Sequence, residues 1–493
     1  MKVFRIIGIA LLVSVLGACI ASAQSWTPVK AAPQAVGPML TLRDGNILAH
    51  SDQGGNANSW YILSPDAQGK YETGTWHGPY NMQSGYSPFF FSSAVFLDGT
   101  HVLVEGGEYN NGQAVWTTIG SYGTYTPGWN NPSLSWVVNN PPAGWSQLGD
   151  AQSDLRADGS YMQANCCTKQ TAIWCGPSCW NAGPSVLAVR NDESGYTALP
   201  NGNVLMVDVQ NNATCGSSKS TEFLAPPYTA WACGPQTTVQ LWQQSDQELG
   251  SAVLFYPNAN HPKGGVFQYG GNVVATNILD INSNTWANGP TLNNMDQADG
   301  PGALEPNGLV LEQVSPGLFN AGCQFQEFDP VAGTLATTVN NAYCPGDSSY
   351  EGHLMIFPTG QIGSVDFGTT IYLYNPKAGV VSAAVPTIIP ATNAYLGGSK
   401  NNILYGIQLN GLTENNAYGD DYQMATNYPL IRFTDGSGNV WYGFTHDDSS
   451  HSIAPGTVSY TKFDLNPSMP PGTYTMQVVT NGIGSNKVTV KIH

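Results

Sequence analysis

Short apolar runs recur along this chain in pairs, and each pair is joined by a two-residue turn that ends in glycine. In residues 194–208 one run ends at Leu199, the turn is Asn201–Gly202, and the second run reaches Val207. Related phrases occupy residues 37–50, 92–107, 151–165, 249–271, 300–314 and 352–366. Short apolar runs around an Asn-Gly or Asp-Gly pair predict β-hairpins. The chain is therefore predicted to be all-β.

Each hairpin is followed by another apolar run and then by a closing run, often with a tryptophan near its start, such as Trp231 or Trp286. This predicts four strands per repeat. The repeats are roughly 40 to 60 residues apart, which is the period of propeller blades. Counting turn pairs predicts a seven-bladed, kelch-like β-propeller over residues 25–383. Because a propeller closes by joining its chain ends, we expect the strand around Trp26 to complete the last repeat.

The C-terminal part of the chain, residues 386–493, has alternating strands without the repeated phrase. Its length fits an immunoglobulin-like β-sandwich. It contains no cysteine, so an antibody-type disulfide is excluded. We therefore expect two domains.

The composition limits the partners of the protein. Only 10% of the 493 residues are charged, and the formal net charge is −17. Binding to nucleic acid or to an anionic membrane surface needs clustered Lys and Arg, so both are excluded as expected partners. A glycan, another neutral ligand or a cation remains compatible with this charge. We expect a monomer.

The N-terminus has the features of a targeting segment. Lys2 and Arg5 precede a short apolar run, and Ala21–Ala23 offers a cleavage site, so residues 1–23 are predicted to be a signal peptide. Alternatively, Cys19 ends a lipoprotein-like box and would anchor the protein through a lipid. No later stretch could span a bilayer. We therefore expect a secreted or periplasmic protein, or a lipid-anchored one.

Eight cysteines follow Cys19. In an oxidising compartment they predict four disulfides that link strands within single repeats. Four of them crowd one repeat, which leaves a zinc site open as the alternative. Their CC-x7-C-x3-C spacing lacks the paired C-x2-C pattern that such sites prefer. The crowded cysteines are Cys166, Cys167, Cys175 and Cys179.

A carboxylate recurs at one register of the repeated phrase. Counting back seven residues from the residue before each turn pair, with Phe255 as its counterpart in the repeat whose turn is expanded, gives one position per repeat. These positions are Val36, Phe90, Asp150, Glu193, Glu248, Asp299 and Glu351. In a propeller, equivalent residues near the start of the innermost strands form a ring around one mouth of the central channel. The sequence therefore predicts that five acids converge at this mouth.

Clustered carboxylates repel one another unless a cation compensates them or some remain protonated. An oxygen-rich site favours calcium, magnesium or manganese. A second interpretation is acid–base chemistry by two carboxylates, as in glycoside hydrolysis, with Glu193 and Glu351 as candidates. The third is structural, with each acid accepting backbone N–H bonds at the entry to its repeat.

The arrangement resembles galactose oxidase and glyoxal oxidase, in which a kelch propeller precedes an immunoglobulin-like domain. That family holds copper on the axis with a tyrosine cross-linked to a cysteine, a tyrosine followed by histidine, and a further histidine from the C-terminal domain. The resemblance places Tyr350 at the axial tyrosine and Glu351 at the histidine ligand. Phe90 stands at the counted position of the second repeat, and no counted position is a cysteine. The cross-linked radical cofactor is therefore not expected.

The same resemblance places Thr445 and His446 in the segment that brings a histidine to the axis, so His446 is a further candidate metal ligand. The chain is also similar to secreted bacterial kelch-repeat proteins that share four motifs. These lie at residues 149–153, 165–168, 418–421 and 425–430.

Three functions follow from these observations. The first is an acidic axial site that binds a metal ion or a glycan and is carbohydrate-active. It would comprise Asp150, Glu193, Glu248, Asp299, Glu351 and His446 as metal ligands, with Glu193, Glu351 and Tyr350 in catalysis. The second is a copper-dependent oxidase with altered ligands, and the third is a non-enzymatic adhesion or scaffold module at the cell surface.

Overall fold

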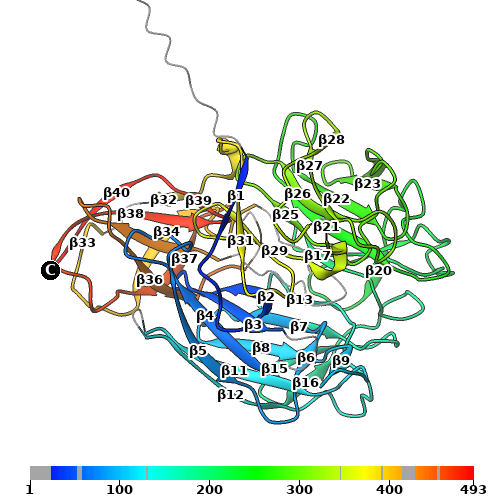
Figure 1. Ribbon diagram of the computed structural model, residues 1–493, viewed down its shortest axis with the longest axis horizontal. Helices are drawn as coiled ribbons and strands as arrows, with labels where there is room; N and C mark the ends of the chain where they lie inside the picture. The colour runs from blue at the N-terminus through cyan, green and yellow to red at the C-terminus, as the bar shows by residue number, and fades with distance from the viewer. Residues whose placement is uncertain are drawn as a thin grey trace, which may run out of the picture.

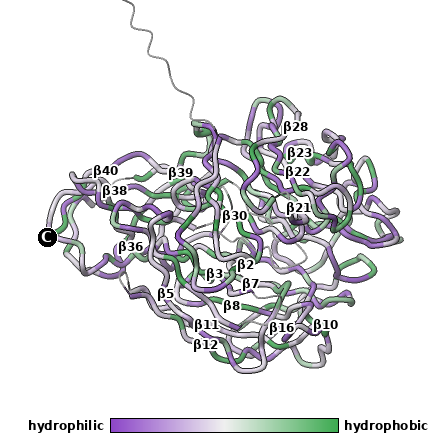
Figure 2. Tube along the Cα trace, in the orientation of Figure 1, coloured by the Kyte–Doolittle hydropathy of each residue, from purple (hydrophilic) through white to green (hydrophobic). Residues whose placement is uncertain are grey.

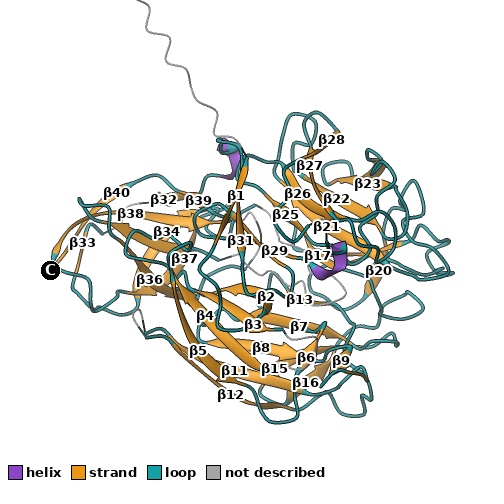
Figure 3. Ribbon diagram, in the orientation of Figure 1, coloured by secondary structure: helices purple, strands orange, loops and turns teal. Residues whose placement is uncertain are grey.

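A computed structural model describes residues 24–52, 58–128, 131–344, 346–389, 392–412, 428–451, 453 and 456–493 (Figure 1). The signal peptide, Cys19 and the motif at residues 418–421 lie outside the described residues, as do residues 425–427. The described chain consists of strands and loops with two short 3-10 helices, η1 (Ser349–Glu351) and η2 (Ser382–Ala384) (Figure 3). None of its helices is long and apolar enough to cross a membrane.

Seven four-stranded antiparallel sheets follow one another along the described chain, and we number them sheets 1 to 7. Sheets 1 to 3 are β2 (Val36–Thr41), β3 (Ile47–Ser51), β4 (Ser59–Ser64) and β5 (Thr75–Asn81); β7 (Ser92–Val95), β8 (His101–Glu105), β11 (Gly120–Thr126) and β12 (Ser133–Asn139); and β13 (Ser153–Leu155), β14 (Tyr161–Ala164), β15 (Thr171–Gly176) and β16 (Cys179–Ala182). A small extra sheet beside sheet 2 contains β6 (Pro88–Phe89), β9 (Tyr109–Asn110) and β10 (Gln113–Ala114).

Sheets 4 to 6 continue the same pattern. They are β17 (Tyr196–Ala198), β18 (Val204–Val207), β19 (Thr221–Leu224) and β20 (Trp231–Cys233); β21 (Leu249–Phe255), β22 (Gly265–Gly270), β23 (Thr276–Asp280) and β24 (Thr285–Asn288); and β25 (Gly302–Leu304), β26 (Val310–Val314), β27 (Gln324–Asp329) and β28 (Thr334–Thr337).

Sheet 7 joins the two ends of this region. It contains β29 (His353–Ile356), β30 (Ile362–Val365), β31 (Tyr372–Asn375) and, as its outer strand, β1 (Ser25–Pro28). Trp26 lies opposite Tyr374 in the β1–β31 register, so the predicted closure by the N-terminal strand is confirmed.

The first strands of the seven sheets form a closed ring. Each contacts the first strand of the next sheet, and β29 of sheet 7 contacts β2 of sheet 1. The first two strands of each sheet are joined at the repeated turn, as in the Gly308 turn, where Gly308 N–H donates to Glu305 O. Apolar side chains of neighbouring sheets pack in shared clusters between them, as Phe267 and Phe328 do with stacked rings 3.7 Å apart. This is a β-propeller, with the repeated turns at one end of the inner strands and the counted register at the other.

The C-terminal region forms a separate sheet with strand order β32-β34-β37-β36-β35-β38-β40-β33. Its strands are β32 (Thr387–Ile389), β33 (Ala394–Tyr395), β34 (Asn402–Ile407), β35 (Leu430–Thr434), β36 (Val440–His446), β37 (Ser459–Asp464), β38 (Gly472–Thr480), β39 (Ile483–Gly484) and β40 (Val488–Ile492). β36 pairs with β35 through its first residues and with β37 through its last three. It therefore joins one half of the sheet, which contains β32, β34 and β37, to the other half, which contains β35, β38, β40 and β33. Leu404 and Phe463 of one half share a core with Ile431 and Val490 of the other, which makes two packed layers.

The C-terminal region packs on the turn end of the propeller. Arg43, in the β2–β3 turn, forms a buried ion pair with Asp448 at 2.7 Å. Thr445 N–H donates to Arg43 O at 3.0 Å, and Asp447 N–H donates to Leu97 O of the β7–β8 turn at 3.0 Å. Leu42 of the propeller and Phe444 of the C-terminal region belong to one buried apolar cluster. Figure 2 shows how apolar and polar residues are distributed along both regions. The opposite mouth, where the counted register lies, is therefore not the end that these C-terminal contacts cover.

Candidate functional site

The residues at the counted position of the repeats share a backbone conformation. Phe90, Asp150, Glu193 and Asp299 all have positive φ, at 52°, 63°, 51° and 53°. In sheet 5 the residue with positive φ is Gln247, one position before Glu248. Left-handed conformations are costly for residues with a Cβ and gather at functional sites, because surrounding structure must hold them in place. The chain therefore makes the same sharp turn at the entry to five sheets, and this turn places the acids at one end of the inner strands.

Two groups of carboxylates form around Glu193. Oxygen atoms of Glu193, Glu248 and Asp299 lie within 4.8 Å of one another, and so do oxygen atoms of Asp150, Asp192 and Glu193. Asp150, Asp192 and Asp299 are buried, while Glu193 and Glu248 are half-buried. We call these five residues the acidic mouth. Four of them are the predicted acids of sheets 3 to 6.

Asp192 was not among the predicted residues, because the counting takes one position per repeat. It precedes Glu193 and reaches the acidic mouth from the same turn. Glu108, in the loop after β8, also faces the mouth, since Asp150 and Asp192 both raise its pKa. Two adjacent acids at Asp192 and Glu193 were the available signal for the first residue. No sequence pattern marked the second.

Electrostatics at the acidic mouth oppose ionisation. Burial, and then repulsion from Asp150, raises the pKa of Glu108 to about 7 and that of Asp192 to about 6. Burial and the charges of Asp150 and Asp192 raise the pKa of Glu248 to about 8, although a hydrogen bond with Asp299 lowers it. Burial and Glu248 raise the pKa of Asp299 well above its ordinary value. Without a compensating positive charge, Glu248 and Asp299 therefore retain protons at neutral pH.

Arg190 and Trp116 bind two residues of the acidic mouth, Asp192 and Asp150. Arg190 forms an ion pair with Asp192 and donates to Gln247 Oε1 at 3.2 Å. Trp116 Nε1 donates to Asp150 Oδ2 at 3.1 Å. Among the ion pairs that the structure describes, the one formed by Arg190 involves one of these five acids, Asp192. One guanidinium facing five carboxyls leaves an excess of negative charge.

Aromatic rings line the neighbouring part of the mouth, from sheets 2, 6 and 7. Phe90 lies 4.0 Å from Phe89 and 6.4 Å from Tyr350 between ring centroids. Phe319, which is exposed, lies 5.1 Å from Tyr350. Asp299 and Glu351 both raise the pKa of Tyr350 after burial, so this phenol faces the acids. The mouth thus has an acidic side and an aromatic side that meet at Tyr350.

Glu351 is oriented differently from the other predicted acids. It ends helix η1, and its carboxylate accepts the Ser348 backbone N–H at 2.7 Å in a capping box. It adds to the charge around a separate pair, Asp347 and Asp366, in which burial, Asp347 and then Glu351 raise the pKa of Asp366 to about 8. The structure therefore gives Glu351 the local role of binding a backbone N–H, and it lies outside the two carboxylate groups.

His446 lies at the other end of the propeller. Its ring nitrogens contact Asp447 at 3.1 Å and Asp464 at 3.3 Å, both in the C-terminal region. The adjacent Thr445 and Asp447 bond to the repeated turns, as described above. The counted positions lie seven residues before the repeated turns, and seven extended residues span about 20 Å, which separates these turns from the acidic mouth. His446 is the last residue of β36, and it pairs with Lys462 of β37 in the C-terminal sheet. We therefore leave His446 out of the site.

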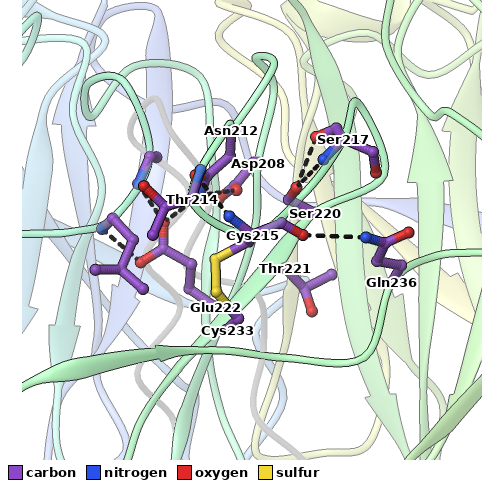
Figure 4. The surroundings of a disulfide bond; sticks show 12 residues. Asp208, Asn212, Thr214, Cys215, Ser217, Ser220, Thr221, Glu222, Cys233 and Gln236 are labelled. Atoms are coloured by element: carbon purple, nitrogen blue, oxygen red, sulfur yellow. Dashed lines mark hydrogen bonds between the residues drawn. A yellow bond between two sulfur atoms is a disulfide. The ribbon is translucent and has the colours of Figure 1, made fainter.

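The eight cysteines form four disulfides. Cys215–Cys233 and Cys323–Cys344 each lie within one repeat, as predicted; Figure 4 shows the first beside the buried acids Asp208 and Glu222. The crowded repeat pairs Cys175 with Cys179 and Cys166 with Cys167. The zinc alternative is therefore not needed. Cys166–Cys167 joins adjacent residues, so this one disulfide does not link strands.

The donor atoms at the mouth do not fit the copper centre that the family resemblance implies. The described residues there offer carboxylate and phenol oxygens, whereas that centre needs imidazole and a cysteine-linked tyrosine. His353 is buried within the channel beside His50, and burial lowers its pKa to about 3. Oxygen donors suit calcium, magnesium or manganese.

No protein-family model and no curated protein matches the sequence. Among solved structures, the chain is similar to a fungal alcohol oxidase of the AA5 family in complex with copper, with 13% identity, a TM-score of 0.53, and coverage of 96% of this chain and 99% of that one. It also matches a catalytically inactive virginiamycin B lyase from Staphylococcus aureus with quinupristin (8% identity, TM-score 0.47, 72% and 99% coverage). A third match is the extracellular domain of a putative hybrid two-component system from B. thetaiotaomicron (10%, 0.46, 96% and 59%). At 13% identity the first similarity shows the fold alone.

Proposed function

We propose that this protein binds a divalent cation, calcium or manganese, at the acidic mouth and uses it to hold a neutral ligand such as a glycan. The observation that carries the proposal is that Glu193 belongs to both carboxylate groups, so the five acids converge on one side chain. Calcium takes six to eight oxygen ligands in flexible geometry, and manganese also accepts carboxylates.

The charge at the site supports a cation. Arg190 pairs with Asp192, while burial, and then repulsion from the other acids, raises the pKa values of Asp192 and Glu248. A divalent ion would remove this repulsion and displace the retained protons. Trp116 and Arg190 would then act as outer groups that orient Asp150 and Asp192.

The aromatic side supports the second part of the proposal. Sugar rings stack on exposed aromatic faces and coordinate calcium through pairs of hydroxyl groups. Phe319 offers the exposed ring nearest to Tyr350. The prediction that Glu193, Glu351 and Tyr350 act in catalysis stays a prediction, because it requires a substrate to be identified first.

The experiment is calorimetric titration of metal-free protein with CaCl₂ and MnCl₂. Glu193→Gln should weaken binding at least about tenfold, because it removes a ligand from both groups. Two matched variants should bind as the wild type does: Glu351→Gln, which lies outside the groups, and Asp435→Asn, in the exposed β35–β36 turn. Absence of binding in the wild type, or equal loss in all three variants, would overturn the proposal.

A second candidate is a copper-dependent oxidase, which the similarity to the AA5 alcohol oxidase over 96% of this chain favours. Elemental analysis of protein purified with added Cu²⁺ tests it. Stoichiometric copper, a radical absorption band and peroxide formation from primary alcohols would establish this candidate and refute the calcium or manganese site. We favour the first function because the donor set is oxygen-based.

A further inference from the structure

The disulfide between adjacent residues Cys166 and Cys167 lies directly against the acidic mouth. Cys166 Sγ is 3.7 Å from Asp192 Oδ1, and both sulfur atoms lie within 4.8 Å of a carboxylate oxygen of Asp192. Cys166 is fully buried, whereas Cys167 is half-buried. Among the four disulfides of the described chain, this is the one whose sulfur atoms are grouped with a residue of the acidic mouth, Asp192.

The backbone of the disulfide is tied to the segment that carries two of the acids. Cys167 N–H donates to Asn191 O at 2.7 Å, and Cys166 forms a parallel bridge with Asn191. The Asn191 side chain is itself held by Thr168 O at 3.0 Å and Gln170 O at 2.9 Å. Asn191 immediately precedes Asp192 and Glu193. The position of the Cys166–Cys167 turn therefore fixes the backbone from which these two side chains extend.

The disulfide also reaches Asp150 through packing. Trp116 and Cys167 pack against the buried cluster that contains Cys166. The indole of Trp116 donates to Asp150 Oδ2. Cys167 and Trp116 both have positive φ, at 69° and 44°, so the backbone on each side of this cluster contains a left-handed residue. A change at the disulfide would therefore change the positions of both Asp150 and Asp192.

We propose that Cys166–Cys167 is a redox-sensitive positioning element of the acidic mouth, which holds Asp150 and Asp192 in place for cation binding and releases them when it is reduced. The inference rests on the proposed cation site. Adjacent cysteines can form a disulfide only in a restricted turn, so reduction frees the 166–167 backbone and lets its hydrogen bond to Asn191 change.

The redox step needs an external dithiol. One thiolate of the dithiol attacks a sulfur of the pair and forms a mixed disulfide. The second thiolate of the dithiol then attacks this mixed disulfide, which releases the protein thiolate and the dithiol as a cyclic disulfide. Two electrons and two protons pass to the protein, the Sγ–Sγ bond breaks, and Cys166 and Cys167 become thiols.

The test measures Mn²⁺ binding by electron paramagnetic resonance in redox buffers of graded dithiol content. For the wild type we expect affinity to fall by about ten- to a hundredfold on reduction, the usual effect of losing an outer-shell contact, and to recover on reoxidation. Cys166→Ser/Cys167→Ser should bind at the weakened level and should not respond to dithiol. Cys175→Ser/Cys179→Ser, which removes the other disulfide of sheet 3, should keep the wild-type response.

Each outcome decides one proposal. If Cys166→Ser/Cys167→Ser binds Mn²⁺ as tightly as the oxidised wild type, or still responds to dithiol, the positioning role is refuted. If the oxidised wild type does not bind Mn²⁺ at all, the cation site itself fails instead. Far-UV circular dichroism of each sample verifies the fold, so that a loss from unfolding is recognised, and the redox midpoint of Mn²⁺ affinity is a readout that a purely structural disulfide would not produce.

Discussion

Replacing Glu248 by glutamine should stabilise the metal-free protein and weaken cation binding at the same time. Glu248 approaches Glu193 and Asp299, with carboxylate oxygens within 4.8 Å. Glutamine keeps the size and the hydrogen-bonding capacity of the side chain but removes its charge. A residue whose role is only structural would lose stability on this change, with or without a metal ion.

The magnitude follows from the geometry. Two unit charges about 4.8 Å apart repel by about 3 kcal/mol at an effective dielectric constant of about 20. Because Glu248 is half-buried, solvent screens part of this repulsion, and we expect the variant to gain about 1–2 kcal/mol in the metal-free state. Because the unfolding entropy grows with chain length, this corresponds to a rise in Tm of only about 1–3 °C for a chain of 493 residues. In the calcium-bound state the loss of one ligand should reverse the sign of the effect.

Thermal unfolding should be followed at about pH 9, above the pKa of about 8 for Glu248, so that the wild-type carboxyl is ionised. One series contains a chelator and the other contains calcium in excess, with Asp435→Asn as the control for a change in net charge. The reasoning is refuted if Glu248→Gln lowers Tm equally in both series, or if its calcium affinity equals that of the wild type.

Three further predictions concern the frame around the site. Serine at both Cys215 and Cys233 opens a loop of sequence separation 18 and should lower the free energy of unfolding by about 3 kcal/mol in denaturant titrations; an unchanged value would show that the loop is held by other contacts. Asp208 has a pKa of about 8, raised by burial and by its neighbouring acid, so the stability of its protonated form is fully present below pH 3.8 and is lost as pH rises through about 8. Asp208→Asn should therefore flatten the fall in unfolding free energy between about pH 5 and pH 9, and an identical fall in both proteins would contradict this. Arg43→Met leaves Asp448 buried without its partner and should cost about 3–5 kcal/mol, whereas Arg43→Met/Asp448→Leu should recover most of that loss by calorimetry; no recovery in the double variant would count against the ion pair.

Some features of this protein could be predicted from local sequence alone. Alternating apolar runs and Asn-Gly or Asp-Gly turns depend on neighbouring residues, so the hairpins, the repeat and the closing strand at Trp26 were readable. Because the repeats are equivalent, a fixed register in the sequence became a fixed place in the ring. This is why Asp150, Glu193, Glu248 and Asp299 could be assigned to one mouth.

Only the tertiary structure decided which side chains meet. Asp192 belongs to the acidic mouth and Glu108 faces it, because loops from sheets 2 and 4 converge there, and no periodic pattern in the sequence indicates this contact. Glu351 shares the register but ends a 3-10 helix, whose capping turns its carboxylate to a backbone N–H. His446 remains with the C-terminal sheet because strand pairing, a long-range interaction, holds it there. Local chemistry determined the repeat, and packing between distant segments determined the site.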